Sequence, residues 1–296
     1  MPWNKPVLGI LSLMALHASS ADACSSCGSG AADPVILNPL EPAKFYLGLN
    51  LSEGFQTIDE QGMVRKDYGP DRKTKLELAY AHRLTPHLFV SLDSGLGENR
   101  KGSRSQTGLT DATLNLRWTA WLQDVTEPWW PQVQFVLSHR FQTTRSLQDS
   151  RELNNLDSFG AGYDETFAGV DVWFGMLPVL FGGSFLYSQP WEEATRSGRL
   201  QVGPTQKWIG TVGYKPMEAF KIIGGLVQEK RGGIELDGEP SPVPSDKKSQ
   251  DLFLTLETLR VEEDNVRFTF SKKAAFGANK NATVFRSYTL AWMRTL

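Results

Sequence analysis

Residues 112–122 read ATLNLRWTAWL, and apolar side chains occupy every second position of this stretch. Successive side chains of a β-strand point to opposite faces, so the pattern predicts a strand with one apolar and one polar wall. The apolar wall consists of Ala112, Leu114, Leu116, Trp118, Ala120 and Leu122, and the polar wall of Asp111, Thr113, Asn115, Arg117 and Thr119. Its length matches the ~9–11 residues that a tilted membrane-spanning strand needs.

The same alternation recurs from residue 43 to the end of the chain. Residues share one face in eight further sets: Phe45, Leu47, Leu49 and Leu51; Leu76, Leu78 and Tyr80; Val133, Phe135, Leu137 and Phe141; Ala168, Val170, Val172 and Phe174; Trp208, Gly210, Val212 and Tyr214; Leu252, Leu254 and Leu256; Val266, Phe268 and Phe270; Tyr288, Leu290 and Trp292. Segments 87–97, 178–188 and 219–229 alternate less cleanly, with apolar residues on both faces. Together these segments predict about twelve strands.

The connections between the predicted strands alternate strictly between short and long. Short connections are expected at 84–86, 123–130, 175–177, 215–219 and 261–265, and long polar ones at 56–73, 98–108, 143–161, 189–205, 231–248 and 272–282. Outer-membrane barrels have short periplasmic turns and long extracellular loops. A soluble β-sandwich or lipocalin-like barrel would also alternate, but with polar exteriors and loops of mixed length. The sequence therefore predicts an all-β fold, a transmembrane antiparallel β-barrel with its ends on the short-turn side.

The composition supports this class and excludes two others. A mean hydropathy of -0.31 excludes a bundle of membrane helices, each of which needs roughly 20 consecutive apolar residues. The 9 Trp, 16 Phe and 7 Tyr residues suit aromatic girdles at two membrane interfaces. The formal net charge is -2 and no basic face is concentrated anywhere, so nothing indicates a nucleic-acid partner.

The first 23 residues are predicted to be a secretory signal peptide. Lys5 provides a positive charge, residues 7–16 form an apolar run too short to span a bilayer, and Ala21-Asp22-Ala23 fits the small-x-small cleavage rule. A buried N-terminal helix is the alternative interpretation. We therefore divide the chain into a signal peptide (1–23), a periplasmic leader (24–42) and an outer-membrane barrel (43–296).

The leader holds the only two cysteines, Cys24 and Cys27, in a Gly/Ser/Pro-rich segment without periodicity. Four interpretations stay open: a disulfide or inert thiols, a Cu(I) or Zn²⁺ site, a lipidated Cys24, and a redox site. His82 and His87, on a predicted periplasmic turn, are the candidates to complete a metal site. No other cofactor is predicted.

Polar residues on the inward face are the candidates for a solute path through the barrel. The lumen is predicted to be lined by Lys75, Glu77, Asn115, Arg117, Gln132, Gln134, Arg140, Asp171, Lys207, Glu257 and Arg267. A barrel of this strand number has room for a narrow pore or for an interior filled by paired charges, and the pattern allows both.

The sequence does not favour an enzyme. A hydrolase would need a Ser/His/Asp set, whereas the only histidines after the signal peptide are His82, His87 and His139, and no Gly-x-Ser-x-Gly motif occurs.

Two segments resemble known outer-membrane proteins. Residues 108–118 resemble the G-x-G-D-x-x-L-x-x-R/K-Y strand of transporters named after phenol-degradation operons, distant relatives of the long-chain fatty acid transporter, and residues 131–140 resemble the strand that follows it. Turn 82–87 is similar to a common periplasmic turn of such barrels. Residues 140–144, RFQTT, depart from that family's Lys-x-Pro-Thr-Gly. The resemblance implies an outer-membrane barrel with a transport role.

The last strand resembles the C-terminal signal that the barrel assembly machinery recognises, with Leu296 where Phe is usual. Basic pairs in the long loops, at 65–66, 72–73 and 100–101, are expected to contact lipopolysaccharide or to be solvated. We therefore expect a bacterial outer-membrane protein for passive transport of a small solute. The alternatives are a leader that handles metal or docks a periplasmic redox partner, and an outer-membrane hydrolase.

Overall fold

A computed structural model of the protein describes residues 34–38, 40–65, 71–123, 130–145, 150–152, 155–176, 178–195, 198–217, 219–241, 245–258 and 263–296. The predicted signal peptide and both cysteines lie outside these ranges. No helix in the described part of the chain is long and apolar enough to cross a membrane.

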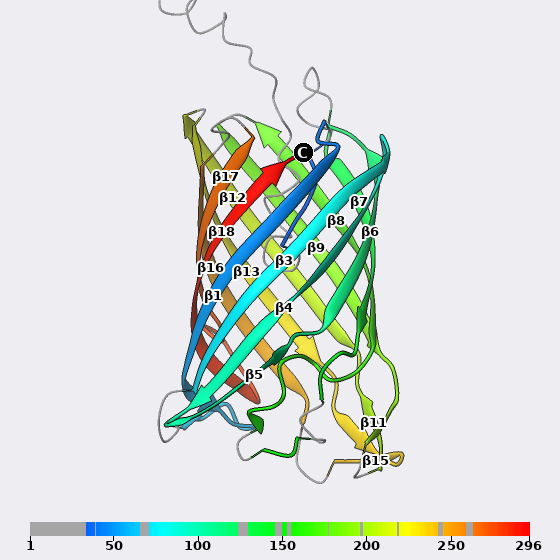
Figure 1. The fold of residues 1–296 in the computed structure, drawn as a ribbon, viewed down its shortest axis with the longest axis vertical. Coiled ribbons are helices and arrows are strands. Elements are labelled where there is room, and N and C mark those ends of the chain that lie inside the picture. The colour runs from blue at the N-terminus through cyan, green and yellow to red at the C-terminus, as the bar shows by residue number, and fades with distance from the viewer. Residues whose placement is uncertain are drawn as a thin grey trace, which may run out of the picture.

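Twelve antiparallel strands form a closed barrel, as the sequence predicts (Figure 1). They are β1 (Ala43–Ile58), β3 (Asp71–Thr85), β4 (Leu88–Lys101), β6 (Ala112–Trp121), β7 (Gln132–Phe141), β8 (Glu165–Met176), β9 (Val179–Pro190), β12 (Thr205–Met217), β13 (Phe220–Arg231), β16 (Lys247–Thr258), β17 (Asp264–Lys272) and β18 (Ala282–Thr295). Each pairs with its neighbours in the chain, so the topology is a simple meander.

The barrel closes where β1 pairs with β18. Their register runs from Lys44 opposite Thr295 to Ile58 opposite Ala282, with one irregularity between Gly54 and Gln56. Closure leaves no sheet edge, so the strands' backbone N–H and C=O groups are paired within the barrel, which hydrocarbon could not do for them.

The outer face is apolar and the inner face polar along the strand that decides the fold. Leu116 is 38% exposed on the outer face, whereas its neighbours Asn115 and Arg117 are 6% and 2% exposed inside the barrel. On the outer face Trp118 stacks on Phe135 of the adjacent strand, with ring centroids 5.6 Å apart. The predicted alternation is therefore confirmed, and it gives the barrel a lipid-compatible exterior.

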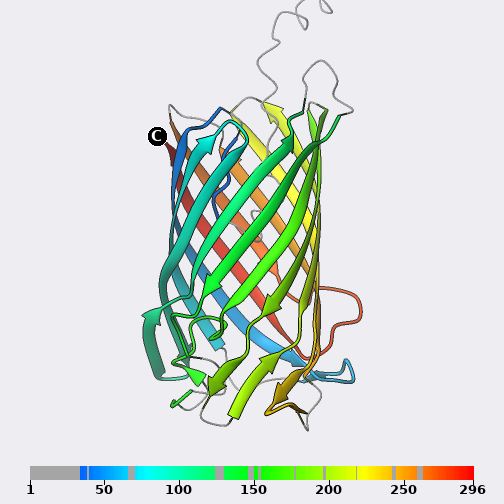
Figure 2. The ribbon, with the colours of Figure 1, turned by 90° about the vertical axis from the view of Figure 1, so that its right-hand side faces the viewer.

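The two kinds of connection lie at opposite ends of the barrel (Figure 2). Short connections, such as the turn between β3 and β4, lie at the end where the chain terminates, and there the N–H of Leu296 donates to the carbonyl of Ala43 at 3.0 Å. The long connections lie at the other end. We call these the short-turn end and the long-loop end.

The long connections contain more regular structure than the sequence predicts. Residues 98–108 were expected to form a loop, but β4 continues to Lys101 and pairs with β5 (Arg104–Leu109). The other short strands at this end are β2 (Val64–Arg65), β10 (Glu193–Thr195), β11 (Gly198–Val202), β14 (Ile234–Leu236) and β15 (Glu239–Pro240). The sequence analysis missed these short strands because their composition is polar, and a hairpin outside the bilayer needs no apolar face. The turn at Asp237 and Gly238, with φ values of 53° and 81°, has the left-handed geometry of two-residue hairpins.

Candidate functional site

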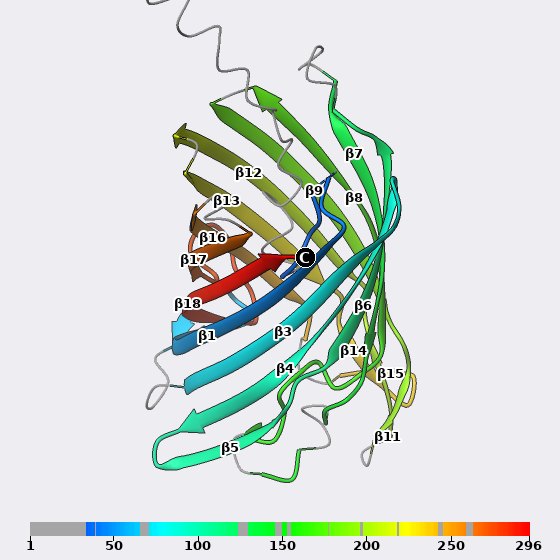
Figure 3. The same ribbon diagram turned by 45° about the horizontal axis from the view of Figure 1, so that its top comes forward.

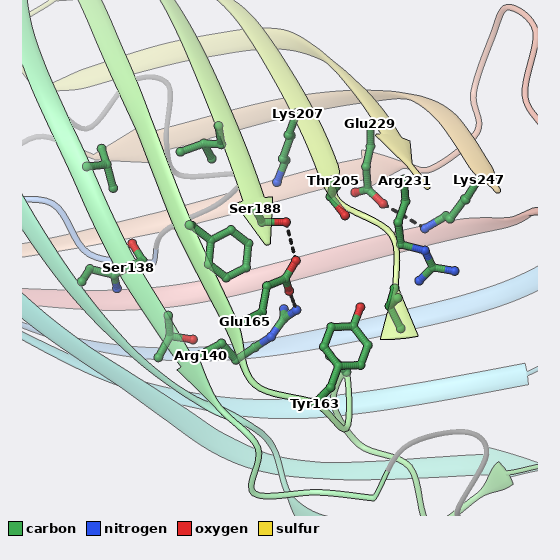
Figure 4. Close-up of a pocket in the computed structure, with 18 of the residues that line it drawn as sticks. Ser138, Arg140, Tyr163, Glu165, Ser188, Thr205, Lys207, Glu229, Arg231 and Lys247 are labelled. Atoms are coloured by element: carbon green, nitrogen blue, oxygen red, sulfur yellow. Dashed lines mark hydrogen bonds and ion pairs between the residues drawn. The ribbon is translucent and has the colours of Figure 1, made fainter. Parts of the chain in front are cut away.

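A cavity of about 610 Å³ lies inside the barrel towards the long-loop end (Figure 4). Its walls come from the inward positions of the strands and from the loop that precedes β8. The lining carries seven basic side chains and two acidic ones: Lys73, Arg117, Arg140, Lys207, Arg231, Lys247 and Lys273 against Glu165 and Glu229.

Strand periodicity places these groups together. Glu229 and Arg231 are two residues apart at the end of β13, so both point inward, and Lys247 opposite Arg231 begins the neighbouring strand β16. Lys207 takes the equivalent position on β12, directly opposite Glu229. Because antiparallel partners on one face lie about 5 Å apart, the charges converge on one wall of the cavity.

The wall on β7 and β8, one strand away from β12, is held by a small group of ion pairs. Arg140 of β7 pairs with Glu165 of β8, and Glu165 also accepts a hydrogen bond from the hydroxyl of Ser188 (Figure 4). The Arg140 guanidinium lies 5.2 Å from the ring centroid of Phe167 and 5.9 Å from that of Tyr163. Arg140 is therefore held by a carboxylate and two aromatic faces.

Among the described residues of the cavity lining, Glu229 is the acid on the lysine-rich wall. Its Oε1 accepts from Nζ of Lys247 at 3.1 Å, and Lys207 and Lys273 also act on it electrostatically. Asp251, further along β16, also acts on Lys207, but two carboxylates against three ammonium groups still leave this wall with a positive excess.

Paired polar groups lie in the lumen from the cavity wall towards the short-turn end. Arg117 pairs with Asp171, both almost completely buried, and Nδ2 of Asn115 donates to Asp93 at 3.3 Å. Closer to the short-turn end, Glu257 contacts Lys221 at 3.2 Å and Arg267 at 2.9 Å. Paired charges therefore fill part of the interior, which is one of the two arrangements that the sequence allowed. The cavity itself is hollow.

Apolar groups cover another part of the inner wall. Trp173, Leu180, Ile209, Ile223, Val227 and Phe253 form a buried cluster inside the barrel. The Trp173 ring lies so close to Gly182 that a Cβ there would come within 1.9 Å of it, and Phe253 covers Gly225 in the same way. This cluster explains why segments 178–188 and 219–229 carry apolar residues on both faces: one face meets lipid and the other packs in the lumen.

The chain before β1 packs inside the barrel at the short-turn end. Val35, Ile36 and Leu37 are 1–3% exposed and pack inside the barrel in a cluster with the inward side chains Tyr46, Ala79, Ala81, Phe89, Ala291 and Met293. Figure 3, which turns this end forward, shows the segment running inside the ring of strands.

Polar contacts hold this segment in place. Lys44 Nζ donates to the carbonyl of Ile36 at 3.2 Å and contacts Glu41 at 2.6 Å. The Arg83 guanidinium donates to the carbonyls of Asn38 and Glu41 at 2.5 and 2.9 Å. The described end of the predicted leader is thus part of the barrel interior. We call residues 34–38 the inner segment.

The eleven residues predicted to line the lumen all occupy inward strand positions, but only some reach the cavity. Asn115, Arg117, Arg140 and Lys207 line it. Lys75 and Glu77 pair with each other on β3 at 2.6 Å. The remaining residues lie buried outside its lining: Gln132, Gln134, Asp171, Glu257 and Arg267.

Six charged residues of the cavity were missed: Lys73, Glu165, Glu229, Arg231, Lys247 and Lys273. Lys73, Arg231, Lys247 and Lys273 fall in ranges that the sequence analysis assigned to long loops. Alternation that continues past the last lipid-facing residue, as in Glu229-x-Arg231 and Lys247-x-Ser249-x-Asp251, was the available signal.

One long loop is tied to the barrel at the mouth of the cavity. The carboxylate of Asp111 accepts hydrogen bonds from the hydroxyl of Thr144 at 2.8 Å and from the N–H of Ala161 at 2.6 Å. The amide of Asn99 donates to the carbonyls of Leu156 and Ser158 at 3.0 and 2.8 Å.

Gly108 completes this anchor because the ring of Phe159 lies directly against it, and a Cβ would come within 2.4 Å of that ring. The Gly108 and Asp111 positions that carry the family resemblance therefore position a loop in this structure.

Of the predicted metal ligands, the structure describes His82 and His87, and each of them has another partner. The His82 ring stacks beside Tyr80 with centroids 6.2 Å apart, and Nδ1 of His87 lies 3.0 Å from the carbonyl oxygen of Thr119. The described residues contain no group of three or more His, Cys, Asp or Glu side chains that could hold a metal ion. Because Cys24 and Cys27 lie outside the described ranges, a site that includes them stays a prediction.

The barrel is similar to a solved outer membrane channel from Pseudomonas putida F1, with a TM-score of 0.71 and 13% identity, over 90% of this chain and 98% of that one. The NanC porin has a TM-score of 0.48 and 11% identity, over 84% of this chain and all of that one. The CymD monoaromatic hydrocarbon channel has a TM-score of 0.45 and 10% identity, over 86% and 89%.

No family model and no curated protein matches the sequence. At 13% identity the Pseudomonas likeness shows the fold alone: this chain has the fold of an outer-membrane β-barrel.

Proposed function

We propose that the protein is a passive channel that carries small polar solutes across a bacterial outer membrane. The observation that carries the proposal is the hollow, charged cavity inside a closed barrel with an apolar exterior. A barrel serving only as a scaffold would gain nothing from seven basic side chains around a space of this size, because unpaired charges cost stability when they leave water. The fold shared with the Pseudomonas channel supports the same function.

The proposal includes an orientation and a set of partners. The long-loop end faces the outside and the short-turn end the periplasm, as in barrels of this class. The apolar belt contacts outer-membrane lipid, the basic loop residues contact lipopolysaccharide, and the last strand is read by the barrel assembly machinery. The leader with Cys24 and Cys27 begins on the periplasmic side, where a periplasmic partner would meet it.

The inner segment has a specific consequence for transport. Its three apolar side chains pack in the lumen against β1, β3, β4 and β18 at the short-turn end, so we expect the segment to obstruct solute passage until it moves. A channel of this design conducts weakly while the segment is seated and more strongly once its packing is lost. The hydrolase alternative finds no support in the cavity, whose lining contains no histidine among the described residues.

Planar-bilayer conductance tests the proposal. We expect the triple variant Val35→Asn/Ile36→Asn/Leu37→Asn to conduct several-fold more than the full wild-type chain, because polar side chains lose the apolar packing that seats the segment. Leu40→Asn is the matched control, since Leu40 is 83% exposed in the same part of the chain and its change should leave conductance at the wild-type level.

Correct assembly of each protein is checked by heat-modifiable mobility on gels. If both the wild type and the triple variant assemble but neither carries current, the protein is not a passive channel.

A further inference from the structure

We propose that the cavity binds a small anion through carboxylate or phosphate oxygens, so that the channel selects anionic solutes over cations. This inference rests on the proposed function for its biological meaning, but the binding site itself follows from the charges of the cavity. The argument concerns the basic residues that remain after ion pairs within the protein are counted.

Three of the seven basic side chains are matched by carboxylates. Arg140 pairs with Glu165, Lys247 with Glu229, and Arg117 with Asp171. Among the described residues no ion pair involves the other four cavity cations, Lys73, Lys207, Arg231 and Lys273. The cavity thus holds an excess of positive charge although the chain as a whole has a net charge of -2.

The cations of the cavity, paired and unpaired, are arranged around one space. Lys207, Arg231 and Lys247 extend from the neighbouring strands β12, β13 and β16, with Glu229 between them (Figure 4). Lys273 follows directly after β17, the next strand of the barrel. Lys73 reaches the cavity from β3, with its Nζ 5.5 Å from the ring centroid of Phe285. A guest that reaches the lysine-rich wall would therefore meet ammonium and guanidinium groups from three or four strands.

The donor chemistry matches oxygen anions. The Arg231 Nε is buried without a hydrogen-bond partner among the described residues, so one edge of its guanidinium has an unused donor. Guanidinium groups bind carboxylates and phosphates with paired N–H donors, and ammonium groups add point charge. Hydroxyl groups of Thr205, Ser138 and Tyr163 also line the space and can donate to further oxygens.

The surroundings strengthen this preference. The cavity lies inside a closed barrel whose apolar outer face is expected to contact lipid. The surrounding medium of low dielectric constant concentrates the electric field of the lysine side chains in the lumen. A cation entering from the long-loop end would be repelled, and a neutral solute would leave the unmatched charges uncompensated. An anion pairs with these positive charges and so lowers the free-energy cost of leaving them uncompensated.

Isothermal titration calorimetry of the full chain in detergent tests the inference without requiring conduction. The probes are inorganic phosphate and succinate at low ionic strength, where screening is weakest. We expect saturable binding of at least one probe to the wild type. The lumen variant Lys207→Gln/Arg231→Gln/Lys273→Gln should bind it at least about tenfold more weakly, because three charge-assisted contacts are lost.

A control variant distinguishes the effect of removing positive charge from the cavity from the effect of lowering the protein's net charge. Lys230→Gln/Lys248→Gln/Lys272→Gln also removes three positive charges at the same end of β13, β16 and β17, but from positions adjacent to inward residues and so on the outer face. It should bind like the wild type. The charge-conserving variant Lys207→Arg/Lys273→Arg should bind too, and heat-modifiable mobility confirms that each barrel is folded.

The outcomes separate the two proposals. Absence of saturable binding to the wild type, equal affinity in the lumen variant, or loss of binding in the folded Lys→Arg variant overturns the anion site, even if the barrel conducts. Binding by a barrel that never conducts overturns the passive channel alone.

Discussion

The two ends of the lumen are built from the same twelve strands but have opposite interiors. At the short-turn end the inner segment packs apolar side chains against Tyr46 and Phe89, and Glu257 pairs with both Lys221 and Arg267. At the long-loop end a cavity of about 610 Å³ is lined by seven basic residues and two acids. A polar inner face therefore does not by itself make a pore. Whether the lumen is open depends on which side chains fill the space inside the barrel.

A single strand shows how the change arises. Reading β13 from the short-turn end, the inward positions pass from Lys221, paired with Glu257, through the apolar Ile223 and Val227 to Glu229 and Arg231 in the cavity. Alternation fixes which face each residue occupies, and the residue type at each height sets whether the lumen is dry or hydrated there.

The largest expected difference between the two ends is in the stability lost when one acidic residue at each end is replaced by glutamine. Glu257→Gln should lower the free energy of unfolding by about 3–5 kcal/mol, because the buried cations Lys221 and Arg267 both lose the carboxylate that pairs with them. Glu229→Gln, in the cavity, should cost less than Glu257→Gln, since Glu229 and Lys247 are both partly exposed whereas Glu257 and its partners are buried. Denaturant unfolding in detergent micelles measures both. Equal losses would mean that the two ends do not differ in hydration.

A smaller effect concerns the loop tied over the cavity mouth. Burial alone would raise the pKa of Asp157, but hydrogen bonds from Ser150, the backbone of Arg151 and Arg145 outweigh it and lower the pKa to about 2 from 3.8. A depressed pKa stabilises the loop above pH ~4 and the contribution is lost as the pH falls towards 2.

We therefore expect pepsin to cleave loop 143–161 of the wild type much faster at pH 2 than at pH 4. Asp157→Asn should be cut readily at both, and the inner segment should stay protected throughout. A wild-type loop that is equally resistant at both pH values would show that Asp157 does not hold it.

The fold was predictable from sequence because its main constraint is local. Lipid demands an apolar side chain at every second position, so the number of strands, their lipid-facing parts and the separation of short and long connections could be derived from alternation, whereas the strand ends at the long-loop end could not. The hairpins β5, β10–β11 and β14–β15 were not predicted, because no lipid constrains their side chains and their sequences read as polar loops.

The site was only partly predictable, for two physical reasons. Residues such as Arg231 and Lys273 continue the inward alternation beyond the apolar belt, where the outward positions turn polar and the contrast between faces disappears. The inner segment packs with side chains that are distant in the sequence, such as Phe89 and Met293. The periodicity of a short stretch of sequence cannot predict such contacts. The apolar run Val35-Ile36-Leu37 within a polar leader was the one sign that this segment is buried.

The central claim is that the lumen is sealed at the short-turn end and open to water at the long-loop end, and thiol accessibility tests it most directly. In a background where Cys24 and Cys27 are replaced by serine, single cysteines at Thr205 and Ile36 report on the cavity and on the inner segment. We predict that a charged, membrane-impermeant thiol reagent modifies Thr205→Cys rapidly in the folded barrel, while Ile36→Cys reacts only after unfolding. Equal modification rates at the two positions would contradict the account.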